Sequence, residues 1–104
     1  MRFRPTTYKE WTDDAQASVT EVVIRGTKEV EITWLWDDVK YDGKATSADG
    51  HEYQGTYAGS DDTGKFDFKL YKLTTGERLL LGRWYSEVNG DEREFLLVAE
   101  PSAD

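Results

Sequence analysis

The few side chains that could take part in catalysis are scattered along the sequence. His51 is the only histidine and stands beside Glu52, and a histidine with a positioned acid can act as a general base. Arg83 with nearby acids is a second combination that would suit a small hydrolase or isomerase. The pattern around His51 is that of an ordinary residue at the end of a strand. Catalysis is therefore the third hypothesis for this chain.

The acidic residues do not form a recognisable metal or hydrolase motif. Doublets occur at Asp13-Asp14, Asp37-Asp38 and Asp61-Asp62, where adjacent carboxylates in turns are solvated. Glycosidases instead need two carboxyl groups about 5–10 Å apart across a cleft. Residues 60–64 lack the alternating acids and the later glutamate of a calcium loop. One histidine and no cysteine exclude the usual zinc sites, so we expect neither a metal nor a cofactor.

The strongest pattern is a set of aromatic residues at alternating positions of the predicted strands. Indole N–H and phenol O–H groups supply the few polar contacts that a ligand pocket needs. The same rings would also fill an ordinary core, because protein interiors are close-packed. Phe66 and Phe95 are expected to face inward with these rings. The candidate ligand-binding residues are Trp34, Trp36, Tyr53, Tyr57, Phe68 and Trp84.

Turn sequences separate runs of strand-forming residues at regular intervals. Asp42-Gly43, Asp49-Gly50 and Asn89-Gly90 favour two-residue hairpins, because type I′ turns need positive φ at both central positions. Short strands about ten residues apart are typical of a β-sandwich or barrel. The predicted strands are Ser18–Arg25, Glu29–Trp36, His51–Ala58, Lys65–Leu73, Arg78–Glu87 and Glu92–Glu100.

These elements predict an all-β fold: an antiparallel up-and-down meander of six to eight strands. We expect a closed or nearly closed barrel rather than a two-sheet sandwich, since two-residue hairpins favour up-and-down order. Residues 1–104 form a single domain, in which residues 1–17 are an N-terminal segment that could cover one end of the barrel. Residues 7–17 fit a short helix or a loose first strand, and residues 43–50 fit a hairpin or a loop.

Pairing the strands across their turns collects the large rings on one face. Tyr57 then faces Phe66, Phe66 faces Trp84, and Trp84 faces Phe95. A second row places large residues opposite glycines, which lets a sheet curve; it reads Gly55, Phe68, Gly82 and Leu97. The inward rings and strand glycines make a non-catalytic module, holding a small apolar or aromatic ligand in the barrel interior, the leading hypothesis.

The opposite face of the same strands is mixed. Arg83 and Arg93 are expected on it, together with an apolar patch in which Leu81 opposes Val98. Something must cover such a patch, either the N-terminal segment through Tyr8 and Trp11 or a second copy of the chain. Self-association as a homodimer is thus the alternative hypothesis. Its candidate interface residues are Leu79, Leu81, Leu96 and Val98.

The net charge restricts the partners. The formal charge is −8, with 21 acids against 13 bases, which repels phosphate backbones and anionic lipid surfaces. We therefore expect neither a nucleic-acid nor a membrane partner. The chain has no cysteine, and no apolar stretch follows residues 1–5, so we expect a cytoplasmic protein without signal peptide or transmembrane helix.

Four segments resemble, in their order, the small barrels of the calycin superfamily. They are Asp49-Gly50, Gly55-Thr56-Tyr57, Phe66–Leu70 and Leu81–Tyr85. The superfamily includes avidin-like proteins, fatty-acid-binding proteins and lipocalins. The Gly-Thr-Tyr step is similar to one in the avidin family, where the tyrosine contributes to the biotin pocket, and only Tyr57 matches it. The Gly-x-Trp motif that opens lipocalins is missing. The resemblance implies a barrel architecture and not biotin binding.

Overall fold

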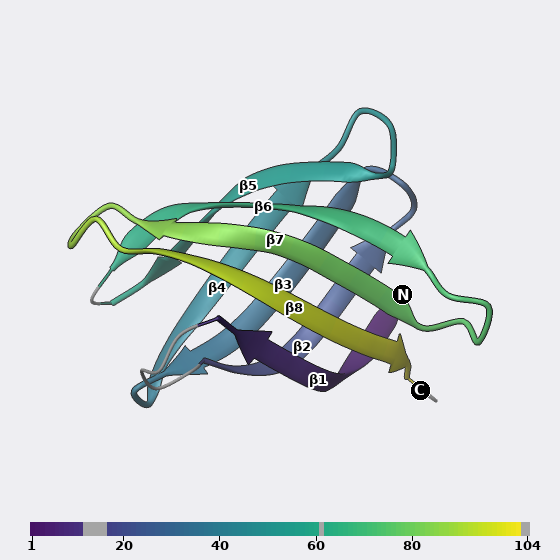
Figure 1. Ribbon diagram of the computed structural model, residues 1–104, viewed down its shortest axis with the longest axis horizontal. Helices are drawn as coiled ribbons and strands as arrows, with labels where there is room; N and C mark the ends of the chain where they lie inside the picture. Colours follow the sequence, from purple (N-terminus) through teal and green to yellow (C-terminus); the bar gives the residue numbers. More distant parts are fainter. Residues whose placement is uncertain (12–16, 61, 103–104) are drawn as a thin grey trace.

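Eight antiparallel strands form a closed barrel in the computed structural model, which describes residues 1–11, 17–60 and 62–102. Each strand pairs with its neighbours in sequence, and the last strand pairs back with the first (Figure 1). The all-β, closed up-and-down fold is thus confirmed. Among the described residues there is no helix of any length, and so none that could span a membrane. The strands are β1 (Arg2–Glu10), β2 (Ser18–Arg25), β3 (Glu29–Trp36), β4 (Val39–Thr46), β5 (Glu52–Gly59), β6 (Thr63–Lys72), β7 (Arg78–Ser86) and β8 (Glu92–Pro101).

The strand that the sequence pattern missed is β4. A hairpin at Asp42-Gly43 was predicted there, and it is wrong because both residues lie inside this strand. Gly43 instead leaves room for the Phe66 ring, since a Cβ at this position would lie 2.9 Å from that ring. The hairpin turn is made by Asp37 and Asp38, whose φ angles are 53° and 63°. Residues 2–10 of the N-terminal segment form β1, a strand of the barrel wall, and residues 12–16 lie outside the described residues.

The predicted register is right for one hairpin and shifted by two residues in two others. Phe66 faces Trp84 across β6 and β7, as expected. In contrast, Tyr57 faces Gly64 rather than Phe66, and Trp84 faces Arg93 rather than Phe95. The predicted rows of aromatic residues directly opposite one another were therefore wrong. A register shift of two residues keeps every side chain on its own face, so the same rings still point inward but are offset along the strands.

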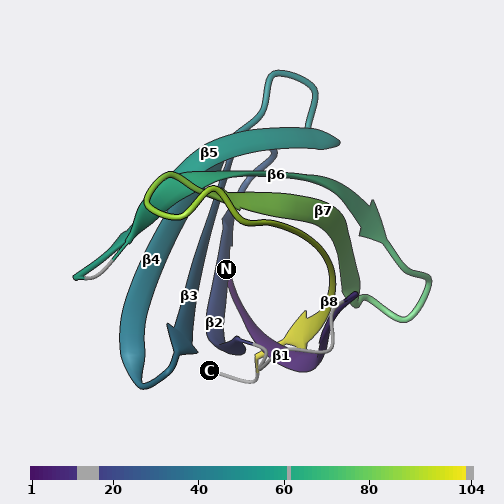
Figure 2. The ribbon, with the colours of Figure 1, turned by 60° about the vertical axis from the view of Figure 1, so that its left-hand side comes forward.

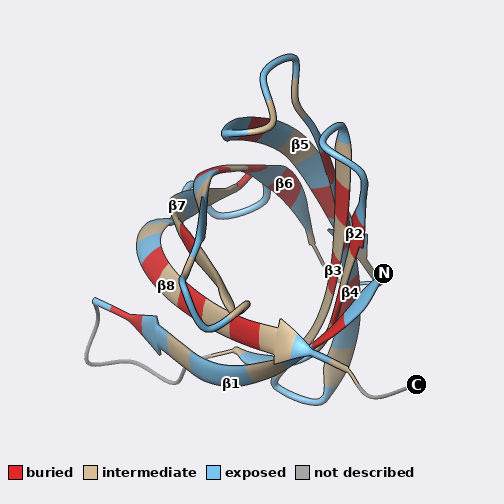
Figure 3. Ribbon diagram, turned by 90° about the vertical axis from the view of Figure 1, so that its right-hand side faces the viewer, coloured by how far each residue is buried: buried red, intermediate tan, exposed pale blue. Residues whose placement is uncertain are grey.

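One end of the barrel is filled by a packed core. The five largest fully buried side chains lie on five different strands, and the strands curve round this interior (Figure 2). Buried and exposed positions alternate along much of the wall, as expected where one face of a strand meets the core (Figure 3). These five side chains are Val22, Val30, Tyr53, Leu80 and Leu97.

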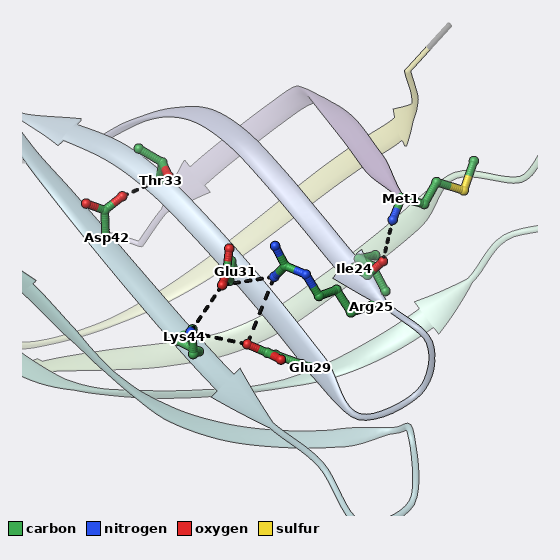
Figure 4. Close-up of polar contacts among 8 residues, drawn as sticks. All are labelled: Met1, Ile24, Arg25, Glu29, Glu31, Thr33, Asp42 and Lys44. Carbon is green, nitrogen blue, oxygen red and sulfur yellow. Dashed lines mark hydrogen bonds and ion pairs between the residues drawn. The ribbon is translucent and has the colours of Figure 1, made fainter. Parts of the chain in front are cut away.

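The outside of β2, β3 and β4 carries paired charges. Arg25 lies 2.9 Å from a carboxylate oxygen of Glu31, and Lys44 lies 3.3 Å from the same oxygen (Figure 4). Thr33 donates a 3.0 Å hydrogen bond to Asp42 nearby. Exposed ion pairs contribute little stability, typically about 0.2–1 kcal/mol each. Their effect here is that the charges of Glu29 and Glu31 are balanced by Arg25 and Lys44.

We expect Gly82→Ala to destabilise the barrel strongly. A Cβ on Gly82 would lie 1.9 Å from the Asp67 carbonyl oxygen and 2.6 Å from Phe68 Cα, so β6 and β7 would have to move apart. The free energy of unfolding, measured by urea denaturation, should fall by about 3 kcal/mol, the upper end of overpacking costs. The control is Gly26→Ala, where φ is 60° but no atom lies within 4 Å, so only the backbone strain of about 1 kcal/mol is expected. Equal losses in the two variants would contradict this close approach.

Candidate functional site at the barrel mouth

The β3–β4, β5–β6 and β7–β8 loops meet at one end of the barrel, called the mouth below (left side of Figure 1). They surround an open pocket of about 230 Å³. An apolar cavity of about 150 Å³ is enough for benzene, so this pocket has room for a compact molecule of one or two rings. Strand residues line its walls, namely Trp34, Trp36, Val39, Tyr41, Tyr57 and Trp84, and loop residues form its rim, namely Asp37, Asp62, Val88, Asn89 and Asp91.

The five aromatic rings of the wall touch one another in a connected chain. The Trp34 ring lies 5.9 Å from Tyr41 and 5.3 Å from Tyr57, measured between centroids. The Trp84 ring lies 6.3 Å from Tyr57 and 6.0 Å from Trp36. The Trp34–Tyr41 pair is stacked and the other three are edge-to-face, and both arrangements are attractive at these distances beyond simple burial. The rings therefore hold one another in position without a ligand.

Below the pocket the barrel interior is filled. The space between Trp34, Trp84, Phe66 and Phe95 is about 30 Å³, which holds no more than one or two water molecules. Tyr53 and Phe68 lie in the packed core, stacked at 5.1 Å with an interplanar angle of 5°. Of the six candidate ligand-binding residues, the structure thus brings Trp34, Trp36, Tyr57 and Trp84 together at the mouth. It leaves Tyr53 and Phe68 out of the pocket.

A buried ion pair stands beside two of the pocket tryptophans. The Glu10 side chain is fully buried, and its Oε1 lies 3.3 Å from Nη1 of Arg93, whose side chain is 11% exposed. The Arg93 guanidinium lies 4.8 Å from the centroid of the Trp36 ring and 5.5 Å from that of Trp84. Stacking of a guanidinium on indole rings is favourable, more so where water is excluded. The ion pair therefore fixes the wall formed by these two rings.

The other carboxylate oxygen of Glu10 is also satisfied. The Tyr8 hydroxyl donates a 2.9 Å hydrogen bond to Oε2, and the Ala17 backbone N–H donates one of 3.1 Å. Burial, and then the charge of Glu10, raise the pKa of Tyr8 far above its ordinary value. The hydroxyl therefore stays protonated and donates. Three separate donors thus hold this one carboxylate.

The expectation that Arg93 lies on the outer face was wrong. Arg93 faces Trp84 across β7 and β8, and its guanidinium contacts two inward rings. The sequence contains a signal for this position, because Arg93 has the same parity on its strand as the inward residues Phe95 and Leu97. Glu10 likewise shares the parity of Tyr8, and sequence reasoning missed it altogether.

Asp62 is held at the rim by a small hydrogen-bond network. The Ser86 hydroxyl donates to Asp62 Oδ1 at 2.9 Å, and the Gly59 N–H donates to the Asp62 carbonyl at 2.9 Å. The Tyr57 hydroxyl lies 3.0 Å from the Tyr85 carbonyl and 3.4 Å from Asp62 Oδ2. Burial, followed by the charge of Asp62, raises the pKa of Tyr57 well above its ordinary range, so this hydroxyl also stays protonated. The network makes Asp62 a fixed negative charge at the edge of the pocket.

The residues considered for catalysis lie away from the mouth. His51 is exposed in the β4–β5 loop at the opposite end, with its Nδ1 3.0 Å from the Leu70 carbonyl oxygen. Arg83 lies on the outside, 3.0 Å from Glu92. The structure thus brings neither side chain to the pocket. Within the described part of the chain, no group of three acidic, histidine or cysteine side chains is placed to hold a metal ion.

The four candidate interface residues gather on the outside of β7 and β8. Leu79 faces Val98 and Leu81 faces Leu96, so the predicted pairing of Leu81 with Val98 was wrong by two residues. All four side chains are half-buried. Tyr8 does not cover them, because its ring stacks on Phe95 inside the barrel at 5.9 Å, whereas Trp11 lines the same outer groove as Leu81.

Comparisons with protein-family models, with curated proteins and with solved structures gave no match for this chain.

We expect Glu10→Gln to cost about 3 kcal/mol of unfolding free energy. The amide keeps the size of the side chain but removes the negative charge that pairs with the mostly buried Arg93 cation, and breaking a buried ion pair typically costs about 3–5 kcal/mol. The matched control is Glu92→Gln, which removes the half-exposed pair with Arg83 and should cost less than about 1 kcal/mol. Urea denaturation of the two variants measures the difference. A loss for Glu10→Gln as small as that of the control would show that this pair is solvated.

Proposed function

We propose that this protein is a non-catalytic binding module that holds a small apolar or aromatic ligand in the mouth of its barrel. One observation carries the proposal: five aromatic rings surround an open pocket of about 230 Å³, directly above a packed core. Ligand sites are typically concave and mostly apolar, with a few placed polar groups. Here Asp62 and Asn89 are such groups.

The pocket is preorganised, which favours binding. Its rings are fixed by one another and by the Arg93–Glu10 pair, so a ligand does not have to order them. Immobilising a flexible side chain on binding costs about 0.5–1.5 kcal/mol, and a rigid wall avoids that cost. The limited volume restricts the ligand to a compact ring system. A long acyl chain does not fit, because the interior below the pocket is filled.

The tryptophans provide a direct test of this proposal by NMR. Trp34, Trp36 and Trp84 line the pocket, whereas Trp11 is exposed outside it and serves as an internal control. We expect neutral one-ring and two-ring compounds such as benzyl alcohol and indole to shift the three pocket indole N–H signals with saturation. The Trp11 signal should stay in place. Shifts confined to Trp11, or no saturable shift with any compound of the panel, would contradict the proposal.

A pair of variants locates the site. Trp36→Ala should weaken binding of the same compounds about tenfold, equivalent to about 1.4 kcal/mol, because it removes one wall of the pocket. Trp11→Ala should leave the affinity unchanged. The ¹H–¹⁵N spectrum of each variant reports whether its fold is retained. Equal affinities in a folded Trp36→Ala variant and the parent would place the ligand elsewhere.

A further inference from the structure

The mouth pocket combines aromatic walls with a rim whose charged residues, among those that the structure describes, are all acidic. Each of the three loops at the mouth contributes one aspartate, namely Asp37, Asp62 and Asp91. Among the described residues, no lysine, arginine or histidine lines the pocket or lies within ion-pair distance of these aspartates. We propose that the ligand is an organic cation, an ammonium group attached to a compact ring. This inference rests on the proposed function and names the ligand class of the same site.

The arrangement of the rings suits a cation. The Trp34 and Tyr57 planes meet at 65°, those of Tyr41 and Tyr57 at 75°, and those of Tyr57 and Trp84 at 88°. These pairs are edge-to-face, whereas Trp34 and Tyr41 are stacked at 11°, so the rings that line the pocket lie in more than one plane. The face of an aromatic ring is the negative pole of its quadrupole, and sites lined by several aromatic rings recognise ammonium groups.

The rim charges differ from the acids on the outer wall. Glu31 and Glu92 lie 2.9 and 3.0 Å from Arg25 and Arg83, so those charges are balanced within the protein. The Asp62 carboxylate instead accepts a neutral hydrogen bond from Ser86, while the Gly59 N–H donates to the Asp62 backbone carbonyl. Its charge is oriented but not cancelled. A cationic ligand supplies the missing counter-charge, whereas an anionic ligand is repelled.

The position of Arg93 indicates which part of the pocket takes the ammonium group. Its guanidinium already lies against Trp36 and Trp84, and it is balanced by Glu10 at 3.3 Å. A second cation at those two rings would be repelled by it. The ammonium group therefore belongs near Trp34 and Tyr57, beside Asp62, and the ring of the ligand faces Trp36 and Trp84.

Three probes that share one ring and differ in charge test this inference. They are benzylamine, which is a cation at pH 7, benzyl alcohol, which is neutral, and benzoate, which is an anion. Dissociation constants are measured from the pocket indole signals at low salt. We expect benzylammonium to bind at least tenfold more tightly than benzyl alcohol, benzoate to bind most weakly, and the preference for the cation to shrink as salt is added.

Asp62→Asn isolates the charge, because the amide keeps the side-chain oxygen that accepts from Ser86. The variant should weaken the binding of benzylammonium about tenfold and change the affinity for benzyl alcohol by less than twofold. The matched control, Glu92→Gln on the outer wall, should affect neither probe. If benzyl alcohol binds at the mouth as tightly as benzylammonium, the inference is overturned and the proposed function stands. If neither these probes nor any compound of the neutral panel binds at the mouth, the proposed function fails as well.

Discussion

Backbone pairing between β1 and β2 covers only a short part of these strands, and the Glu10 carboxylate links the chain where that pairing has ended. Among the described residues, pairing of β1 with β2 comprises only Arg2 with Val23 and Phe3 with Val22, whereas pairing of β1 with β8 continues to Glu10. Beyond Phe3, the Glu10 side chain joins the strands instead. It accepts the N–H of Ala17, the residue just before β2, and contacts Arg93 of β8.

The mouth depends on the same carboxylate. A buried charge is costly unless it is paired and hydrogen-bonded, so Glu10 requires its donors Tyr8, Ala17 and Arg93. Arg93, fixed in this way, lies against Trp36 and Trp84 and sets one wall of the pocket. The same interaction thus links β8 to the chain just before β2 and sets one wall of the candidate site. An ionic group is therefore kept inside an interior whose other buried side chains are mostly apolar or aromatic.

Inward aromatic residues have two roles in this barrel, and their position along the strands decides which. Tyr53, the second residue of β5, stacks on Phe68 in the packed core. Tyr57, four residues further along the same strand, reaches the mouth and contacts Trp34 and Trp84. The sequence pattern is the same for both, since each lies on the inward face. Only the lengths and pairing of the strands distinguish core from pocket.

The sequence predicted the parts of the structure that follow from alternation along a strand. Six strands and the inward face of β3, with Trp34 and Trp36, were recognisable from that alternation. The register was not, because a shift by two residues preserves the face of every side chain. Gly43 was taken for a turn residue although it makes room for Phe66.

The polar parts of the site were the least predictable. Glu10 and Arg93 were not recognised as an inward pair, because charged residues are rarely buried and their partnership spans nearly the whole chain. The role of Asp62 depends on Ser86, which is 24 residues away and on another strand. Contacts of this kind appear only once the strands are paired, so no local pattern could reveal them.

The most direct test of the account is the position of a bound probe. Intermolecular nuclear Overhauser effects between benzylammonium and the isotope-labelled protein report which side chains lie against it. We expect contacts to Trp34, Tyr57 and Trp84 and none to Tyr53 or Phe68, since the pocket ends above the packed core. Contacts to Leu79, Leu81, Leu96 and Val98 instead would contradict it, and would make the outer face of β7 and β8 the binding surface.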